Sequence, residues 1–425
     1  MALLVPQINF VANTVFLSGL GEMELGAAGI TGVYYLVFAL VGNGLNSGLQ
    51  ALIARRAGEN RPVEIGRMFA KSIWIALLFA LAGIIITFVF APFFLSSVLS
   101  MPGIQEEASS FIRIRILGLP FLYLFQMGNA LLVGTNNSRY MKYGFIAEAV
   151  LNIFLDYGLI YGKFGLPAIG FNGAAIASVF AEAVGMIIVT CIIFYKRFHH
   201  RFALFTQMRF NGDLLRLIFR QSSPLVMQYV LSVSAWLLFY ILIEHYGERP
   251  LAISNTMRNI FGVFGVFVWA FASTSNAMVS NIIGQGRQHE VLFLVRKIAR
   301  LSFFFTAALC LLLNLKPELI LGLYGRGPGF ISEAIPVLRM VTTGLLLMSI
   351  STVWLNAVTG TGNTRVNLGI EIVAIILYSI YIYFVLHEWR LSLVWAWTSE
   401  LVYWTVLFTL PWLYLRSGKW KNKVI

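Results

Sequence analysis

The sequence predicts an all-α integral membrane protein with twelve transmembrane helices in two pseudo-symmetric six-helix bundles. Three observations support this fold class. Only 12% of the 425 residues are charged and 59% are hydrophobic, whereas a soluble protein carries about a quarter charged residues. The apolar residues form long blocks, such as 73–90 and 226–243, and about 20 such residues cross a bilayer. The second half of the chain also repeats the first.

Twelve apolar blocks separated by short polar joints are expected to be the spans. Their approximate bounds are 1–20, 26–50, 69–93, 111–133, 141–162, 171–195, 221–246, 252–280, 293–315, 333–357, 366–387 and 391–415. The expected domains are an N-terminal bundle (1–195), a basic cytoplasmic linker (196–220), and a C-terminal bundle with a short basic tail (221–425). The stretch from Pro224 to Gly247 is longer than the stretch from Met1 to the matching Gly21. We therefore expect the first helix to lack its opening turn.

The internal repeat appears when the chain is shifted by about 226 residues. Residues 134–139 read GTNNSR and residues 360–365 read GTGNTR. Shared apolar composition does not explain matches of Gly, Asn, Thr and Arg in loops. Because each copy holds an even number of helices, both copies enter the membrane from the same side. Parallel repeats of this kind, rocking about a central cleft, recur among transporters.

Charge distribution predicts the orientation. The formal net charge is +13, and about 22 of the 31 basic residues fall in the even-numbered joints and the tail. The positive-inside rule makes that side cytoplasmic, together with both termini. No basic motif is interleaved with exposed aromatic residues, so we expect no nucleic-acid partner. The expected location is a bacterial inner (plasma) membrane, crossed many times.

Enzymatic motifs are missing from the sequence. It contains no nucleotide-binding loop, no catalytic triad and no metal-ligand spacing. Cys191 and Cys310 both lie inside apolar blocks and suggest neither a disulfide framework nor a metal site. We expect a protein that is not an enzyme and has no cofactor.

Ionisable residues inside spans are costly and point to function. The first half contributes Glu148, Asp156 and Glu182, and the second half contributes Arg258, Glu371 and Glu400. Glu371 either has a function or reaches the cytoplasmic interface. Arg258 either pairs with a carboxylate or extends its charge to the membrane surface. Glu400 matches Glu182 at a shift of 218.

The polar residues of the first half are expected to converge. Asp156, Ser178 and Asn13 each lie roughly 9–11 Å from the outer ends of their helices at 1.5 Å per residue. Asn152 and Glu182 form a second layer, roughly 15–17 Å in. Converging oxygen atoms would suit a sodium ion, or a proton on a carboxylate that desolvation keeps neutral. Alternatively, Asn152 and Ser178 are hydrogen-bonding residues between packed helices.

The sequence resembles the multidrug and toxic compound extrusion (MATE) family over nearly its whole length. The resemblance rests on residues 20–25 (LGEMEL), 55–60 (RRAGEN), 134–139 (GTNNSR), 173–178 (GAAIAS) and the Asn152/Asp156 pair. It implies efflux of amphipathic, cationic compounds in exchange for sodium or protons. It also implies a cation site in the N-terminal bundle formed by a helix-one Asp, a helix-five Asn and Asp, and a helix-six Thr.

In this chain those positions are Asn13, Asn152, Asp156 and Ser178. Ser178 keeps the hydroxyl, but Asn13 removes one of the two carboxylates that the family pattern expects. Asp156 alone would carry one proton or hold one sodium ion, with help from Glu182. No other metal is expected. The predicted partners are a small-molecule substrate and the lipid bilayer, and the predicted state is a monomer.

Two other functions fit parts of the sequence. A flippase for a lipid-linked oligosaccharide or other polar lipid would need basic residues for pyrophosphate. The candidates are Arg113, Arg115, Arg258 and Arg339, of which only Arg258 is expected within a span. A channel or a receptor that does not transport is the third interpretation, and the asymmetric ionic cluster disfavours it.

Overall fold

The chain is an all-α integral membrane protein, seen here in a computed structural model. The structure describes residues 13, 16–17, 19–98, 102–205, 212–322, 324, 327–421 and 423. In these ranges every element is helical, and eleven helices are long and apolar enough to cross a membrane. The first expected span, 1–20, lies mainly outside the described residues. The eleven helices are therefore consistent with twelve spans in two bundles.

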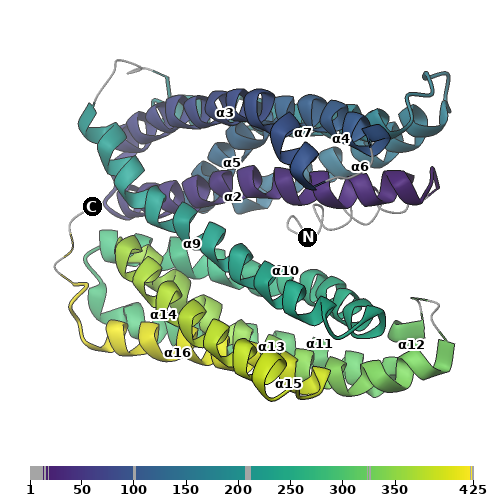
Figure 1. Ribbon diagram of the computed structural model, residues 1–425. Helices are drawn as coiled ribbons and strands as arrows, with labels where there is room; N and C mark the ends of the chain where they lie inside the picture. Colours follow the sequence, from purple (N-terminus) through teal and green to yellow (C-terminus); the bar gives the residue numbers. More distant parts are fainter. Residues whose placement is uncertain are drawn as a thin grey trace. The chain divides into compact units, whose positions relative to one another are not determined.

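The chain divides into two compact units, Met1–Val226 and Met227–Ile425. The first unit is formed by α2 (Glu22–Gly58), α3 (Pro62–Val98), α4 (Pro102–Arg115), η2 (Ile116–Gly118), α5 (Leu119–Gly134), η3 (Ser138–Tyr140), α6 (Met141–Tyr161), α7 (Phe171–Tyr195) and α8 (Phe198–Arg201). In Figure 1 its long helices are coloured purple to teal. The unit boundary falls inside the next helix, α9 (Gly212–Glu244).

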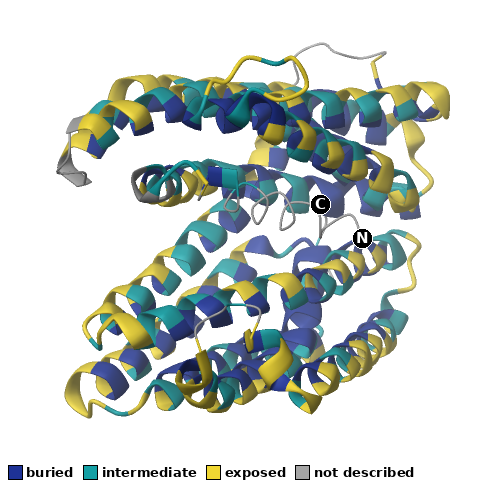
Figure 2. Cartoon of the chain, turned by 90° about the vertical axis from the view of Figure 1, so that its right-hand side faces the viewer, coloured by how far each residue is buried: buried dark blue, intermediate teal, exposed yellow. Residues whose placement is uncertain are grey.

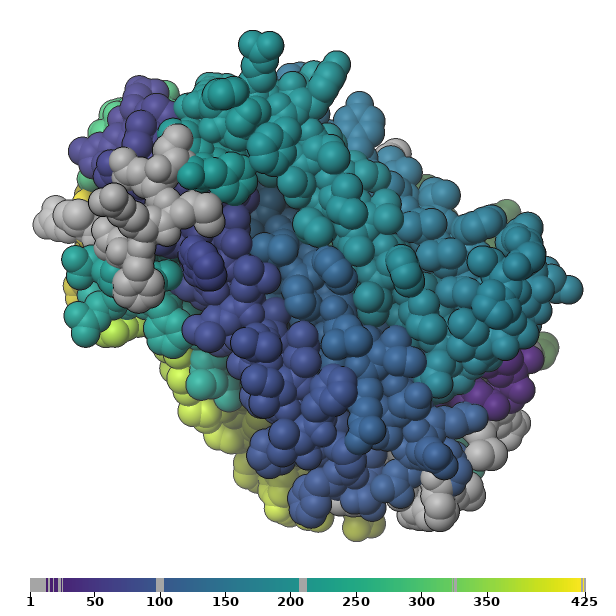
Figure 3. Space-filling view, turned by 90° about the horizontal axis from the view of Figure 1, so that it is seen from above, coloured from purple at the N-terminus to yellow at the C-terminus, as the bar shows by residue number. Residues whose placement is uncertain are grey.

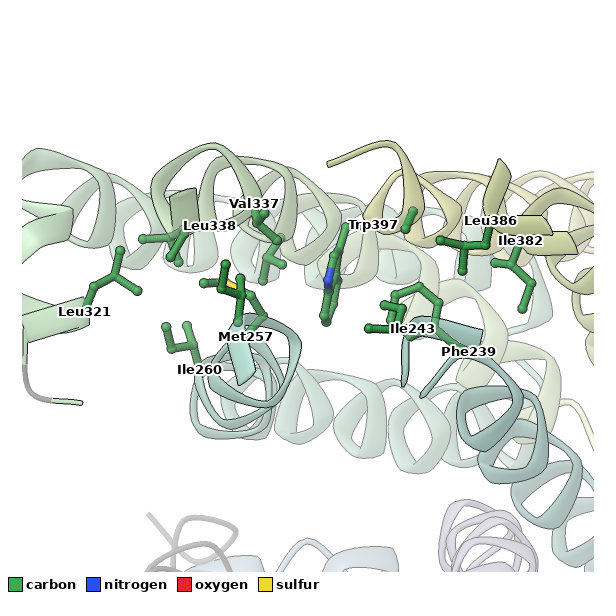
Figure 4. Close-up of a cluster of buried hydrophobic side chains, with 14 of the residues drawn as sticks. Phe239, Ile243, Met257, Ile260, Leu321, Val337, Leu338, Ile382, Leu386 and Trp397 are labelled. Carbon is green, nitrogen blue, oxygen red and sulfur yellow. The ribbon is translucent and has the colours of Figure 1, made fainter. Parts of the chain in front are cut away.

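The second unit continues from α9 to the end of the chain. Its elements are α10 (Glu248–Gly284), η4 (Gln288–Glu290), α11 (Val291–Leu315), α12 (Pro317–Gly322), α13 (Gly327–Gly360), α14 (Thr364–Tyr383), η5 (Phe384–Glu388), α15 (Leu393–Trp397) and α16 (Ser399–Arg416). A large apolar cluster joins α9, α10 and α13 to the end of α14 and to α15. Figure 4 shows this cluster around Trp397, whose indole nitrogen donates a hydrogen bond of 3.2 Å to Ser254.

Several helices begin earlier than the sequence predicted, and the difference is largest for α4 and α9. Helix α9 starts at Gly212 rather than at residue 221, so the second half of the expected linker 196–220 is largely helical. Asp213 in its first turn favours this start, because negative charge stabilises a helix N-terminus. Helix α4 starts at Pro102 rather than at residue 111. Proline is well suited to a first helical position. The polar first turn that follows it can lie outside the hydrocarbon core of the bilayer.

The repeat is visible in the backbone at matching turns. Asn60 and Asn136 adopt left-handed conformations (φ 56° and 61°), and so do Gly286 and Gly362 (φ 77° and 86°). Each Asn is related to its matching Gly by the shift that defines the sequence repeat. Asn and Gly are the residues that tolerate this conformation best, so the two halves use equivalent turn chemistry.

Helix packing is repeated as well. A methyl group added at Gly134 would lie 3.1 Å from the carbonyl oxygen of Gln50, and one added at Gly360 would lie 2.6 Å from that of Asn276. Both members of the second pair are related to those of the first by the shift of the sequence repeat. The internal repeat is therefore a repeat of backbone contacts, as expected of small residues that let membrane helices approach closely.

The outer face of α3 is apolar. Its exposed side chains recur every three or four residues: Trp74, Leu78, Leu81, Ile85, Val89 and Phe93. Figure 3 looks onto the face of the first unit that includes α3, and Figure 2 shows exposed residues on the outer sides of the helices. An exposed apolar stripe of this length identifies a surface that faces lipid.

Candidate cation site

Helices α6 and α7 pack closely in an antiparallel pair, and glycines at the interface define its register. Close approaches join Gly144 to Val189 and Glu148 to Gly185, and join Gly173 to the backbone of Leu159 and Ile160. This register, constant to within one residue, places Asp156 opposite about Ala177 and Ser178 opposite about Leu155. The carboxylate and the hydroxyl therefore lie at nearly the same depth, within about one residue rise.

The described part of the first helix lies against this pair. Leu17, Ile160 and Ala174 are buried in one apolar cluster, and the Tyr161 hydroxyl donates a hydrogen bond of 2.6 Å to the Phe16 carbonyl oxygen. Phe16 contacts Tyr157 and Tyr161, so the segment runs beside the end of α6.

The predicted ligands lie four residues from these three cluster members. Asn13 precedes Leu17 by four residues, Asp156 precedes Ile160 by four, and Ser178 follows Ala174 by four. Because α6 and α7 are antiparallel, the steps to Asp156 and to Ser178 run in the same direction along the bundle, over about 6 Å. Asn13 is helical and half-buried. The α6–α7 register thus sets Asp156 and Ser178 at nearly one depth, and Asn13 lies on the segment packed beside the end of α6.

Asp156 is held by its own helix. It is fully buried, and the Asn152 amide donates a hydrogen bond of 2.9 Å to its Oδ2 atom. Asn152 and Ser178 are also buried. A buried carboxylate among amide and hydroxyl groups has two chemical uses: it can hold a proton, or it can supply oxygen ligands to a hard cation.

Glu182 has a different environment from the one the sequence suggested. Both of its oxygens are bound by Arg115, at 2.9 and 2.6 Å, and the Tyr35 hydroxyl donates to it at 3.1 Å. The Arg115 guanidinium also stacks over the Tyr35 ring, 3.7 Å from the centroid. The structure therefore gives Glu182 an arginine partner. In the α6–α7 register, Glu182 lies at nearly the depth of Asn152 rather than at the depth of Asp156.

Arg113, Arg115 and Arg339 correct a sequence expectation. They were placed outside the spans, yet the structure places them in the candidate spans Gly103–Gly134 and Gly327–Gly360. All three already fall within the expected bounds 111–133 and 333–357, so the expectation that only Arg258 lies within a span was wrong. Arg113 is exposed, and Arg115 is neutralised by Glu182. Arg115 is therefore not available to bind a pyrophosphate, which removes one support for the flippase alternative.

Glu371 is fully buried on α14. Its Oε1 accepts a hydrogen bond of 2.5 Å from Ser232 and another from Tyr403, and its Oε2 accepts one of 3.1 Å from Gln228. Our sequence reasoning missed Gln228 and Ser232. Their spacing of four residues on the apolar helix α9 was the signal that could have identified them.

The other two ionisable residues that the sequence predicted within spans of the second unit, Glu400 and Arg258, contact aromatic side chains. Glu400 accepts a hydrogen bond of 2.9 Å from the Trp404 indole. The Arg258 guanidinium lies over the Tyr240 ring, 5.4 Å from its centroid, and Arg258 is half-buried. The structure therefore gives Arg258 an aromatic partner, while the three donors to Glu371 are all neutral.

The fold and the buried polar site define a class: membrane transporters made of two homologous helical bundles. The MatE family model matches two segments of the chain, residues 1–158 and 224–385, one in each half. The chain belongs to this family of multidrug and toxic compound extrusion transporters.

Curated relatives cover most of the chain. The probable multidrug resistance protein NorM of Thermotoga maritima is 24% identical, over 98% of this chain and 89% of the relative. The protein of the same description from Synechocystis is also 24% identical, over 83% of this chain and 78% of the relative.

Solved structures show the same fold. A MATE crystal structure in complex with MaL6 has a TM-score of 0.90 and 19% identity, with 98% of this chain and 93% of that chain covered. A MOP superfamily transporter from Pyrococcus furiosus has a TM-score of 0.91 and 18% identity, with 100% and 95% covered. The latter is described as having a binding pocket of reverse polarity that suggests a different function.

Proposed function

We propose that this transporter expels amphipathic, cationic compounds from a bacterial cell in exchange for sodium ions or protons. The buried Asn152–Asp156 hydrogen bond supports this proposal, as does the register that sets Asp156 and Ser178 at nearly one depth. Asn13 lies on the segment packed beside the end of α6. The curated relatives described as probable multidrug resistance proteins support the class of substrate.

The proposed mechanism is alternating access. A cation reaches Asp156 from the outer side and stabilises one arrangement of the protein, in which the substrate binds more weakly. An ion can shift such an equilibrium only by the difference between its affinities for the two states. The carboxylate provides that difference, because its charge must be neutralised wherever water is excluded.

Asp156 is the one acidic residue among the four positions of the family's cation site, and this limits how many ions the site exchanges per transport cycle. The family pattern has a second carboxylate where this chain has Asn13. An amide can supply an oxygen ligand but cannot take up a proton or compensate a positive charge. We therefore propose that Asp156 exchanges one monovalent cation per cycle at this site.

Transport from vesicles tests this proposal. The full chain is reconstituted in proteoliposomes loaded with a fluorescent organic cation, and a sodium gradient or a pH gradient is imposed separately. We expect one of the two gradients to accelerate release of the fluorophore, and an ionophore for that ion to abolish the acceleration. Release that responds to neither gradient would contradict ion-coupled export.

A further inference from the structure

Glu371 is the centre of a buried hydrogen-bond network in the second unit. The network joins α9, α13, α14 and α16 through Gln228, Ser232, Thr359, Asn367, Glu371 and Tyr403. Glu371 and Thr359 are almost inaccessible to solvent, and Asn367 is 2% exposed. Such a network costs free energy where a member is left unsatisfied. All the hydrogen bonds to Glu371 are made, and the Oδ1 atom of Asn367 is the buried network atom left without a partner among the described residues.

Glu371 differs from Glu182 in the charge of its partners. Glu182 forms an ion pair with Arg115, which stabilises the ionised carboxylate. No ion pair joins Glu371 to a basic residue in the described part of the chain. A buried carboxylate without a cationic partner is costly as an ion, so a bound proton is the simplest neutralising partner for Glu371.

The network accommodates both protonation states of Glu371. As an anion, Glu371 accepts hydrogen bonds from Ser232, Gln228 and Tyr403. As an acid, Glu371 can donate its proton to the Ser232 oxygen. The Ser232 hydroxyl can then donate to the backbone carbonyl oxygen of Gln228, 2.9 Å away. A hydroxyl group can donate and accept at the same time, so this exchange needs no change in helix packing.

Gln228 disfavours a metal cation at this position. Its carbonyl oxygen Oε1 accepts a hydrogen bond of 3.0 Å from Asn367, so its NH₂ group is turned toward Glu371. Asn367 is itself held by Thr359 at 3.0 Å. A sodium ion needs oxygen ligands, whereas an N–H group pointing at the site repels it.

We propose that Glu371 is a proton-binding site of the second unit, separate from the Asp156 site and not dependent on its role. The titratable groups that face Glu371 are few. Helix α16 contributes Tyr403 and, further along, Glu400, while α14 itself contributes Tyr378, whose ring lies 5.8 Å from that of Tyr403. Helices α9 and α13 contribute only the neutral groups named above.

Infrared difference spectroscopy on the full-length protein in lipid nanodiscs tests this proposal. The spectra compare acidic with alkaline buffer, in which a protonated carboxyl group gives a separate C=O band. We expect one such band to disappear in the Glu371→Gln variant. It should remain in Glu333→Gln, a matched change at an exposed glutamate of the same unit, and in Glu400→Gln.

A second variant assigns the band even if Glu371→Gln fails to fold. In Glu371→Asp the band should persist at a shifted frequency, because an aspartic acid occupies the same network. A band of unchanged frequency in Glu371→Asp, or its retention in Glu371→Gln, would overturn the proposal. Loss of the band on adding sodium would also overturn it, since it would show a competing metal cation.

Parallel spectra of Asp156→Asn separate this inference from the proposed function. We expect the Glu371 band to remain in that variant, because the two carboxylates lie in different units. Disappearance of this band in Asp156→Asn would contradict the assignment to Glu371 without deciding whether Asp156 drives transport.

Discussion

At the residue scale, neighbours decide what each buried carboxylate does. Arg115 binds both oxygens of Glu182, Asn152 donates to Asp156, and only neutral donors surround Glu371. These are three physically different situations: a structural ion pair, a candidate exchange site and a neutral network. Burial alone therefore does not predict the function of an acidic residue.

The Arg115–Glu182 pair provides a prediction about stability. Replacing Arg115 by Met leaves Glu182 buried without its cation, so we expect a loss of about 3–5 kcal/mol in the free energy of unfolding. Thermal unfolding in detergent measures the change. The double variant Arg115→Met/Glu182→Gln removes both charges and should recover much of the loss. A single variant as stable as the wild type would show that the pair contributes little.

Ser178 provides a prediction about ion affinity. Ser178→Ala removes a hydroxyl ligand worth about 0.5–1.5 kcal/mol, or roughly a two- to tenfold weaker apparent affinity for the coupling ion. Ser178→Thr keeps the hydroxyl and should retain the affinity. Both values follow from initial efflux rates measured against ion concentration. Equal affinities in the two variants would assign Ser178 to helix packing.

Depth along a helix can be estimated from the sequence, whereas partners on other helices cannot. The depths of Asp156 and Ser178 follow from counting residues along helices, because an α-helix has a constant rise. The arginine partner of Glu182 could not be predicted, because Arg115 belongs to another helix and sequence periodicity does not identify neighbouring helices. The same limit hid the contact of Ser232 with Glu371.

At the element scale, small residues control how closely the helices approach. The short 3₁₀ segment η2 separates α4 from α5, and Gly118 at its end leaves room for the Arg115–Glu182 pair. A methyl group there would collide with Glu182 and lie 2.8 Å from an Arg115 nitrogen. The expected span 111–133 hid this break, because its apolar pattern continues through η2.

Gly173 provides a prediction for the α6–α7 pair. A methyl group at this position would lie 2.8 Å from the backbone of Leu159, which cannot be relieved by a change of rotamer. We expect Gly173→Ala to lower the free energy of unfolding by about 1–3 kcal/mol, measured by thermal unfolding in detergent. Gly369→Ala is the matched control, since nothing lies within 4 Å of a methyl group there. Equal effects of the two changes would argue against tight packing at Gly173.

At the scale of the whole molecule, the two units share a plan but not their polar residues. Turns and glycine contacts recur at the shift of the sequence repeat, yet the position matching Asp156 is Ile382. The backbone repeat could be predicted because turns with a left-handed residue favour Gly and Asn, so these residue types recur at matching positions. The functional asymmetry depends on side chains that have no such restriction.

Membrane orientation is a whole-molecule prediction. Both native cysteines, Cys191 and Cys310, are first replaced, and single cysteines are then introduced as Gly165→Cys or Lys419→Cys. The loop before α7 should lie outside and the basic tail inside, because basic residues remain on the cytoplasmic side. A membrane-impermeant maleimide should therefore label the loop cysteine in intact cells, and the tail cysteine only in opened vesicles. The reverse pattern would refute the orientation.

The most direct test of ion coupling compares the two aspartates of this chain, buried Asp156 and exposed Asp213. Gradient-driven efflux is measured for Asp156→Asn and Asp213→Asn at equal protein levels. We predict that Asp156→Asn loses acceleration by the ion gradient while it remains folded and binds the fluorescent cation, and that Asp213→Asn transports like the wild type. Undiminished gradient-driven efflux by Asp156→Asn would contradict the account.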